Sequence, residues 1–183
     1  MLLQNDSISH KQLDIINAIN IHLSRLTRIN KNFLLLSKIE NQHFNERETL
    51  DLNELLNENI ELLSDYIKDK QIIIETKINE EYLIVCNKTL IEIMLNNLLI
   101  NAILHNTLKG KIIIELNNRT LNISNSGKIA LNNETIFKRF VVSSSETTGS
   151  GLGLAIVKEI CTRYQWQITY SFQDNFHIFS IMF

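Results

Sequence analysis

The chain has 183 residues, of which 44% are apolar, and its formal net charge is −2. This length suits one domain with an appendage or two small domains, and the apolar content excludes a disordered tail. A charge so close to neutrality gives no electrostatic reason to expect a nucleic acid as partner.

Nothing in the sequence predicts secretion or a membrane span. The N-terminal residues lack the basic region and the long apolar stretch of a signal peptide. The longest uncharged segment, residues 93–108, is too short and too polar to cross a bilayer. Cys86 and Cys161 are too few for a disulfide framework and are typical of small buried side chains. We therefore expect a soluble, cytoplasmic chain or a soluble piece of a longer protein.

Residues 7–44 are predicted to form one long helix. Its apolar side chains recur at alternating steps of four and three, which is typical of a coiled-coil or bundle seam. These side chains are Ile8, Ile15, Ile19, Leu26, Ile29, Phe33 and Leu36. At about 1.5 Å per residue the helix would span roughly 57 Å, too long to bury its seam alone. We expect a self-associating or truncated helical module that ends at a domain boundary near residues 41–50.

Residues 45–183 are predicted to form a second domain of helices and strands. The expected helices are 52–68 (capped by Asp51), 88–107, 134–140 and 151–164, and the expected strands are 71–78, 82–86, 111–116, 120–124, 167–172 and 177–183. These elements do not alternate strictly as strand, helix, strand. The expected fold class is therefore α+β, a sandwich with helices layered on one face of a mixed sheet.

Three of the five glycines lie together in Gly149-Ser-Gly-Leu-Gly-Leu154, at the end of a polar loop and the start of a helix. Glycines let the backbone approach an anion, and the free N–H groups of a helix start favour negative charge. This arrangement suits phosphate. A flexible turn without a ligand is the alternative, because the strand that a dinucleotide motif needs is missing.

Asn97 and Asn101 lie four residues apart, on one face of an otherwise apolar helix. Side-chain amide oxygens suit a partly hydrated Mg²⁺, which takes few protein ligands and several phosphate oxygens. Chance pairing in an Asn-rich chain is the alternative for this motif alone. Between the two motifs lie Ser124-Asn-Ser-Gly127, at the end of an apolar strand, and Ile136-Phe-Lys-Arg-Phe140, before the polar loop.

Taken in order, these four segments resemble the nucleotide-binding domain of sensor histidine kinases, in the superfamily shared with gyrase, Hsp90 and MutL. Residues 97–101 resemble the N box, 125–127 a variant G1 box, 137–140 the F box and 149–154 the G2 box. Four boxes in this order are far more specific than any one of them. The resemblance covers the whole chain.

The resemblance implies ATP and Mg²⁺ as ligands and assigns roles to particular residues. Asn101 would ligate Mg²⁺, Asn97 would support the metal or the nucleotide, and His105 would line the nucleotide. Asn125 stands where the family has an Asp that accepts a hydrogen bond from the adenine amino group, and an amide oxygen can still accept it. The backbone would approach the ring at Gly127. Residues 141–150 would form the lid, and the contacts of its phosphate-binding hinge would come from Gly149, Gly151, Leu152, Gly153 and Leu154.

Several residues depart from the family pattern. Lys128 and Ile129 follow the G1 glycine where a second Gly is usual, and Leu104 replaces the usual Lys three residues after the metal Asn. The lid carries no Arg or Lys, and each missing charge-assisted bond could remove ~1.5–3 kcal/mol of phosphate binding. Arg139 is a candidate phosphate contact and equally a solvated charge, as is Lys138. The sequence leaves both roles open.

One substitution separates this chain from ATP-hydrolysing relatives. These proteins place a Glu four residues before the metal Asn, where it activates the attacking water. Here that position holds Asn97, which cannot act as a general base. We therefore expect independent ATP hydrolysis to be disfavoured.

The resemblance places the phospho-acceptor His on the first helix of a two-helix dimerisation bundle. Residues 1–44 resemble the second helix of that bundle, ending in Leu36-Ser-Lys-Ile-Glu40. His10 is followed by Lys rather than an acidic residue, so we interpret it as a surface residue, and His22 as a polar seam position. No catalytic residue is therefore expected in this chain.

The sequence thus predicts the ATP-binding catalytic part, residues 45–183, of a bacterial sensor kinase whose full-length form is membrane-anchored. The expected partners are a response-regulator receiver domain and a second copy of the chain, joined through the helical bundle. A non-catalytic nucleotide-binding or interaction module that signals by conformation is the alternative.

Overall fold

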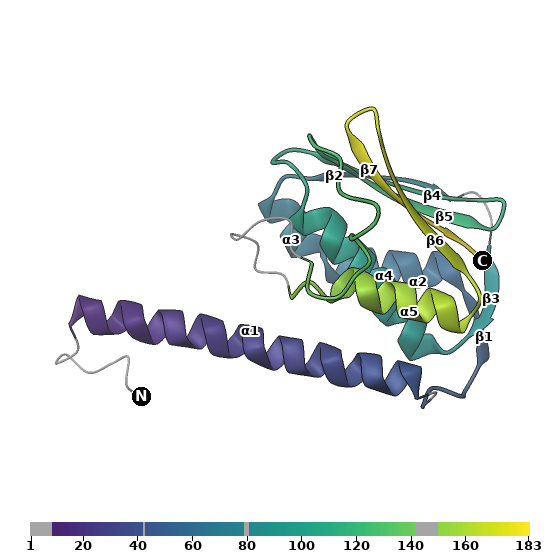
Figure 1. Ribbon diagram of the computed structural model, residues 1–183. Helices are drawn as coiled ribbons and strands as arrows, with labels where there is room; N and C mark the ends of the chain where they lie inside the picture. Colours follow the sequence, from purple (N-terminus) through teal and green to yellow (C-terminus); the bar gives the residue numbers. More distant parts are fainter. Residues whose placement is uncertain (1–8, 42, 79–80, 142–149) are drawn as a thin grey trace.

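The computed structural model describes residues 9–41, 43–78, 81–141 and 150–183. Helices α2 (Leu52–Leu62), α4 (Lys88–Leu104) and α5 (Gly153–Arg163) cover one face of a mixed sheet, as Figure 1 shows. This layering confirms the expected α+β sandwich. The short helix α3 (Ser64–Asp69) follows α2 directly.

The main sheet has the strand order β2-β4-β5-β7-β6. Strand β2 pairs with β4 in parallel, and the other neighbours pair antiparallel. The strands are β2 (Ile73–Ile78), β4 (Lys111–Asn117), β5 (Thr120–Ser126), β6 (Gln167–Gln173) and β7 (Phe176–Met182). Alternate residues of β4, β5 and β7 are buried and form the core with the three helices.

The long N-terminal helix is α1 (His10–Glu40), which begins at a capping box formed by Ser9 and Gln12. It stands away from the domain over most of its length (Figure 1), and its contacts with the domain are made near its C-terminal end. There Leu36 and Ile39 are fully buried. Nearer the N-terminus, the seam side chains of Ile19 and Leu26 are 52% and 62% exposed.

A small sheet was not expected from the sequence. Strand β1 (Glu48–Asp51) pairs antiparallel with β3 (Leu83–Cys86). Strand β1 is only four residues long and mostly polar, so neither its length nor its pattern marks a strand. Asp51 ends β1 and caps α2, accepting hydrogen bonds from the backbone N–H groups of Asn53 and Tyr82.

Two predicted helices were wrong in detail. The helix expected over 52–68 is divided at Leu63, which is buried and which leaves helical geometry with φ −98° and ψ 6°. The helix expected over 134–140 is a series of turns. Its backbone bonds close single turns onto Asn132 and Thr135, and Phe140 adopts a left-handed φ of 64°, which ends any helix.

Both cysteines are buried, as expected. Burial raises the pKa of the Cys86 thiol to about 11 and that of Cys161 to about 12. Neither side chain is therefore a thiolate nucleophile at neutral pH. None of the helices that the structure describes combines the length and the apolar character that a bilayer crossing requires.

Candidate functional site

The predicted metal and phosphate motifs lie on two adjacent helices. Asn97 is on α4, and its side-chain N–H donates to the Ile93 carbonyl. This bond turns the amide oxygen toward α5, where a Cβ placed on Gly153 would lie 2.9 Å from Asn97 Oδ1. Asn101 is one turn further along α4, half-buried, and within the described residues its side chain makes no hydrogen bond. The structure thus brings the N box against the first residue of α5.

Among the residues that the structure describes, no side chain caps the start of helix α5. Its N-cap position is Leu152, which makes no capping bond. The first N–H groups of a helix are unsatisfied unless a side chain, water or ligand accepts from them. The side chain of Leu152 is fully buried and that of Leu154 packs against the core. These two leucines can therefore meet a ligand only through their backbone, while their side chains anchor the start of α5.

The segments before and after residues 142–149 meet at their ends. Phe140 N–H donates to the Gly151 carbonyl at 2.8 Å, and Gly151 has a φ of 68°. A Cβ there would lie 2.8 Å from the Phe140 carbonyl carbon, so glycine is required by both the backbone and the space. Ile136 is buried, and the Phe137 ring meets Phe179 edge-on, which fixes the F box on the core.

Gly149 lies outside the described residues, and so do residues 142–149 of the lid expected over 141–150.

Arg139 is paired with Glu40, at the end of α1. On the other flank of residues 142–149, Asn32 of α1 donates to Ser150 Oγ at 3.2 Å. Both contacts join α1 to the segments that border the predicted lid. The phosphate role of Arg139 stays a prediction, because its guanidinium here meets a carboxylate of α1.

The predicted base-binding residues lie at one end of the helix-facing side of the sheet. Asn125 is fully buried on β5 and donates to the Ser126 carbonyl. Directly opposite it on β7 is His177, which is 7% exposed. Gly127 follows β5, and a Cβ there would lie 2.1 Å from His177 Nε2. A side chain at position 127 would therefore clash with the imidazole ring of His177, so this position requires glycine.

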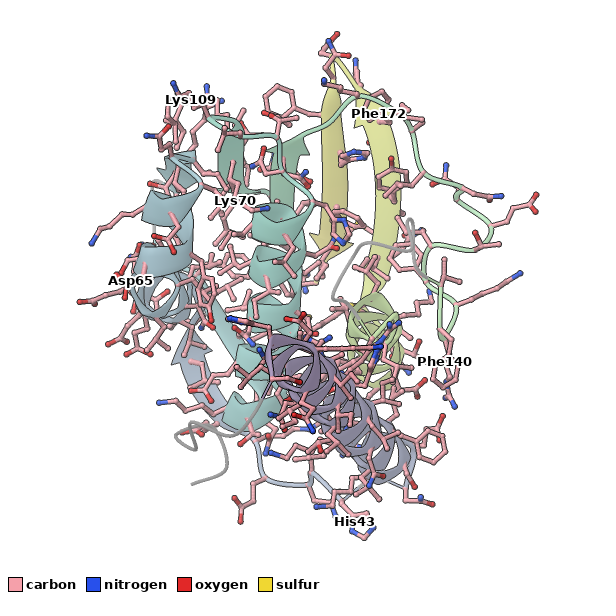
Figure 2. All side chains as sticks on the ribbon, turned by 90° about the vertical axis from the view of Figure 1, so that its left-hand side faces the viewer. His43, Asp65, Lys70, Lys109, Phe140 and Phe172 are labelled. Carbon is pink, nitrogen blue, oxygen red and sulfur yellow. The ribbon has the colours of Figure 1, made fainter. Side chains whose placement is uncertain are left out.

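His105 ends α4 as its C-cap and is half-buried. Burial lowers its pKa, and the nearby positive charge of Lys70 lowers it further. Figure 2 shows Lys70 near this end of α4, where its ammonium donates to the carbonyls of Ile103 and Leu104. This ion complements the negative end of the helix dipole. His105 is therefore neutral at physiological pH and can present an uncharged ring.

Sequence reasoning missed His177 and Tyr170. The Tyr170 hydroxyl lies 2.9 Å from His177 Nδ1, and it accepts a hydrogen bond from the Leu131 backbone N–H. No short motif marks either residue. Only the register that sets β7 beside β5 reveals that His177 faces Asn125.

Comparison with known proteins identifies the family of this chain. Residues 86–180 match the family described as histidine kinase-, DNA gyrase B- and HSP90-like ATPase. The sensor histidine kinase HprS of Escherichia coli K12 is 30% identical over 98% of this chain and 41% of its own length. The heme sensor protein HssS of Staphylococcus aureus strain Newman is 32% identical over 96% of this chain and 40% of its own length.

A solved structure extends the likeness to three dimensions. Histidine kinase ThkA, in a complex with response regulator protein TrrA, superimposes with a TM-score of 0.70 at 28% identity, over 97% of this chain and 52% of that one. The chain spans about two fifths of the length of the curated relatives HprS and HssS. The match covers the N, G1, F and G2 segments, and it places the chain in the family of histidine kinase-, DNA gyrase B- and HSP90-like ATPases.

Proposed function

We propose that this chain binds ATP with Mg²⁺ and positions it for phosphoryl transfer to a histidine outside the chain, as the catalytic part of a two-component sensor histidine kinase. The observation that carries the proposal is the contact between α4 and α5. Asn97 Oδ1 faces Gly153 at the uncapped start of α5. An amide oxygen and free helix N–H groups therefore converge where phosphates would lie.

The nucleotide would extend from the start of α5 to the end of β5. Its phosphates would accept from the backbone N–H groups of residues 153 and 154, and from that of Leu152 if it gives up its bond to Ser150 Oγ, while the Leu152 side chain stays buried and that of Leu154 packs against the core. Its base would lie near Gly127 and the buried Asn125, with the neutral ring of His105 between the two ends. Asn125 Oδ1 would accept the amino proton of the base.

The residues on α4 fit Mg²⁺. This ion prefers oxygen ligands and keeps several water or phosphate oxygens around it. Asn101 offers one amide oxygen with no hydrogen bond among the described residues, and Asn97 offers a second, one turn earlier. When bound, Mg²⁺ would neutralise the charge that develops on the transferred phosphoryl group.

The chain's own residues would then position the substrate rather than activate a nucleophile. Asn97 stands where a water-activating carboxylate would be needed, and an amide cannot take a proton. The acceptor histidine would supply the nucleophile. We therefore expect slow ATP hydrolysis and phosphoryl transfer only when an acceptor helix is present.

Calorimetric titration with ADP, in the presence and absence of Mg²⁺, tests the site. The wild-type chain should bind ADP more tightly with Mg²⁺, and Asn101→Ala should lose that difference. Asn96→Ala is the matched control, because Asn96 is the adjacent amide on α4 and is exposed. Equal loss in both variants, or no effect of Asn101→Ala, would refute the assignment.

The proposed function also implies partners and a place in the cell. We propose a homodimer joined through α1, whose seam side chains are exposed along its N-terminal part. We propose a response-regulator receiver domain as the phosphoryl recipient, as the complex of ThkA with TrrA supports. The chain would then act on the cytoplasmic side of a membrane-anchored sensor.

A non-catalytic module that binds nucleotide and signals by conformation is the second candidate. Leu104, at the position of the usual Lys, is 41% exposed and offers phosphate no charge. Arg139 is engaged by Glu40. A full-length protein that binds ATP but never labels its own histidine would favour this second function.

A further inference from the structure

Three polar side chains interrupt the apolar, helix-facing side of the sheet at one end. Asn125 on β5 lies directly opposite His177 on β7, and Tyr170 lies on the adjacent strand β6. All three are buried, with 1%, 7% and 7% of their surfaces exposed. Phe172, labelled in Figure 2 on β6, packs against the His177 ring with centroids 5.0 Å apart. Buried polar groups require hydrogen-bond partners. The donors and acceptors of these three side chains that have no partner in the protein therefore indicate what a ligand at this end of the sheet must offer.

The hydrogen bonds fix the protonation of His177. Leu131 N–H donates to the Tyr170 hydroxyl at 2.9 Å. Among the described residues, the one acceptor for the hydroxyl proton is His177 Nδ1, also at 2.9 Å. Burial lowers the pKa of His177, and the nearby His105 lowers it further, so the ring is neutral. A neutral imidazole that accepts at Nδ1 carries its proton at Nε2.

The Nε2–H group is directed to the end of β5. A Cβ on Gly127 would lie 2.1 Å from Nε2 and 2.2 Å from Cδ2, so the ring edge lies against the bare backbone of Gly127. Within the described residues no acceptor bonds Nε2. Asn125 donates its N–H to the Ser126 carbonyl at 3.1 Å, which leaves Oδ1 free to accept.

We propose that His177 is a base-contacting residue, and that Asn125 Oδ1 and His177 Nε2–H together select adenine over a 6-oxopurine. This inference rests on the proposed nucleotide site. Adenine presents an amino donor at C6 beside the N1 acceptor, which complements an acceptor–donor pair. Hypoxanthine presents the reverse, an acceptor at C6 and an N1–H donor, and would leave both protein groups unpaired in a buried place.

Tyr170 is the positioning residue of this pair. It does not meet the base, but its proton holds His177 in the tautomer that donates from Nε2. Without the hydroxyl, Nδ1 can take the ring proton and Nε2 becomes an acceptor. Tyr170→Phe should therefore reduce base selectivity while leaving the phosphate contacts of α5 unchanged.

Calorimetric titration of the full chain with ADP and with inosine diphosphate, both with Mg²⁺, tests the inference. The wild type should prefer ADP by about tenfold or more, as expected when a buried donor and acceptor lose their partners. His177→Phe keeps a ring but removes the donor, so the preference for ADP should fall clearly below the wild-type ratio, to the part that Asn125 Oδ1 alone supplies. His177→Gln, whose amide N–H can reach the Nε2 position, should retain the preference.

Two further results separate the possible failures. If the wild type binds neither nucleotide, the proposed function itself fails. If it binds ADP and His177→Phe keeps the wild-type ratio, only the role of His177 is refuted. Nitrogen NMR of the wild-type imidazole needs no variant: it should show Nε2 protonated and shifted by ADP, and an unaffected Nε2 signal would overturn the proposal even if His177→Phe does not fold.

Discussion

At the scale of single residues, the predicted phosphate site depends on the closeness of Gly153 and Asn97. Gly153 has no positive φ, so its backbone tolerates any residue and its small size serves only the approach to Asn97 Oδ1. Alanine at this position would displace the end of the Asn97 side chain. Alanine at position 153 should therefore affect nucleotide binding without lowering the free energy of unfolding.

Gly153→Ala should weaken ADP binding by about tenfold, equivalent to ~1.4 kcal/mol, because it shifts the Asn97 amide. The free energy of unfolding should stay equal or rise by up to ~1 kcal/mol, since Ala favours a helix over Gly. Calorimetry and thermal denaturation measure the two effects. Gly151→Ala is the comparison: its φ of 68° predicts a loss of ~1 kcal/mol in stability. Unchanged ADP affinity in Gly153→Ala would show that Asn97 does not contribute.

The sequence predicted the part of this site that lies in short motifs. Asn97 and Gly153 belong to such motifs, and the structure brings them together at the α4–α5 contact. The partnership of His177 with Asn125 could not be predicted, because it depends on the register between strands far apart in the chain. A shift of one residue would turn His177 to the opposite face of the sheet.

At the scale of elements, α1 is joined to the segments on both sides of the predicted lid. Glu40 pairs with Arg139, and Asn32 bonds Ser150. Both side chains of the ion pair are about two-fifths exposed. Such pairs contribute only ~0–1 kcal/mol to stability. The main effect of the Glu40–Arg139 pair is therefore to hold the Arg139 guanidinium beside α1, and its contribution to the stability of the fold is small.

Glu40→Gln should raise the affinity for ATP by about threefold, because it frees the Arg139 guanidinium to meet phosphate. The double variant with Arg139→Ala should cancel that gain. Glu58→Gln is the control for net charge, since Glu58 is an exposed carboxylate on α2. Wild-type ATP affinity in Glu40→Gln would mean that the ion pair and the nucleotide do not compete for Arg139.

The elements themselves were predicted best where periodicity was strong. Helix α4 and the strands β4 to β7 lie where the apolar patterns placed them, because long buried segments leave a clear signal. The break at Leu63 and the turns of 134–140 were missed, since both depend on burial of single side chains against the core. Tertiary packing there overrides local propensity.

At the scale of the whole molecule, α1 has two different surfaces along its length. Near its C-terminus, Leu36 and Ile39 are buried against the domain, where Arg163 of α5 also donates to the Ile39 and Phe44 carbonyls. Further toward the N-terminus, the seam is exposed and the helix projects toward the viewer in Figure 2. An exposed apolar stripe on a long helix favours association with another helix.

Leu26→Glu should convert a dimer into a monomer, because it places a charge in the centre of the proposed seam between two copies of α1. Ile21→Glu is the matched control: Ile21 lies off the seam and is as exposed as Leu26, at 64% against 62%. Sedimentation should give about twice the chain mass of 21.2 kDa for the wild type and for Ile21→Glu, and the single mass for Leu26→Glu. ADP binding should be unchanged in both variants, because the side chains of Leu26 and Ile21 are exposed and neither packs against the core of the domain. A monomeric wild type would refute the dimer, and a dimeric Leu26→Glu would place the contact on another surface.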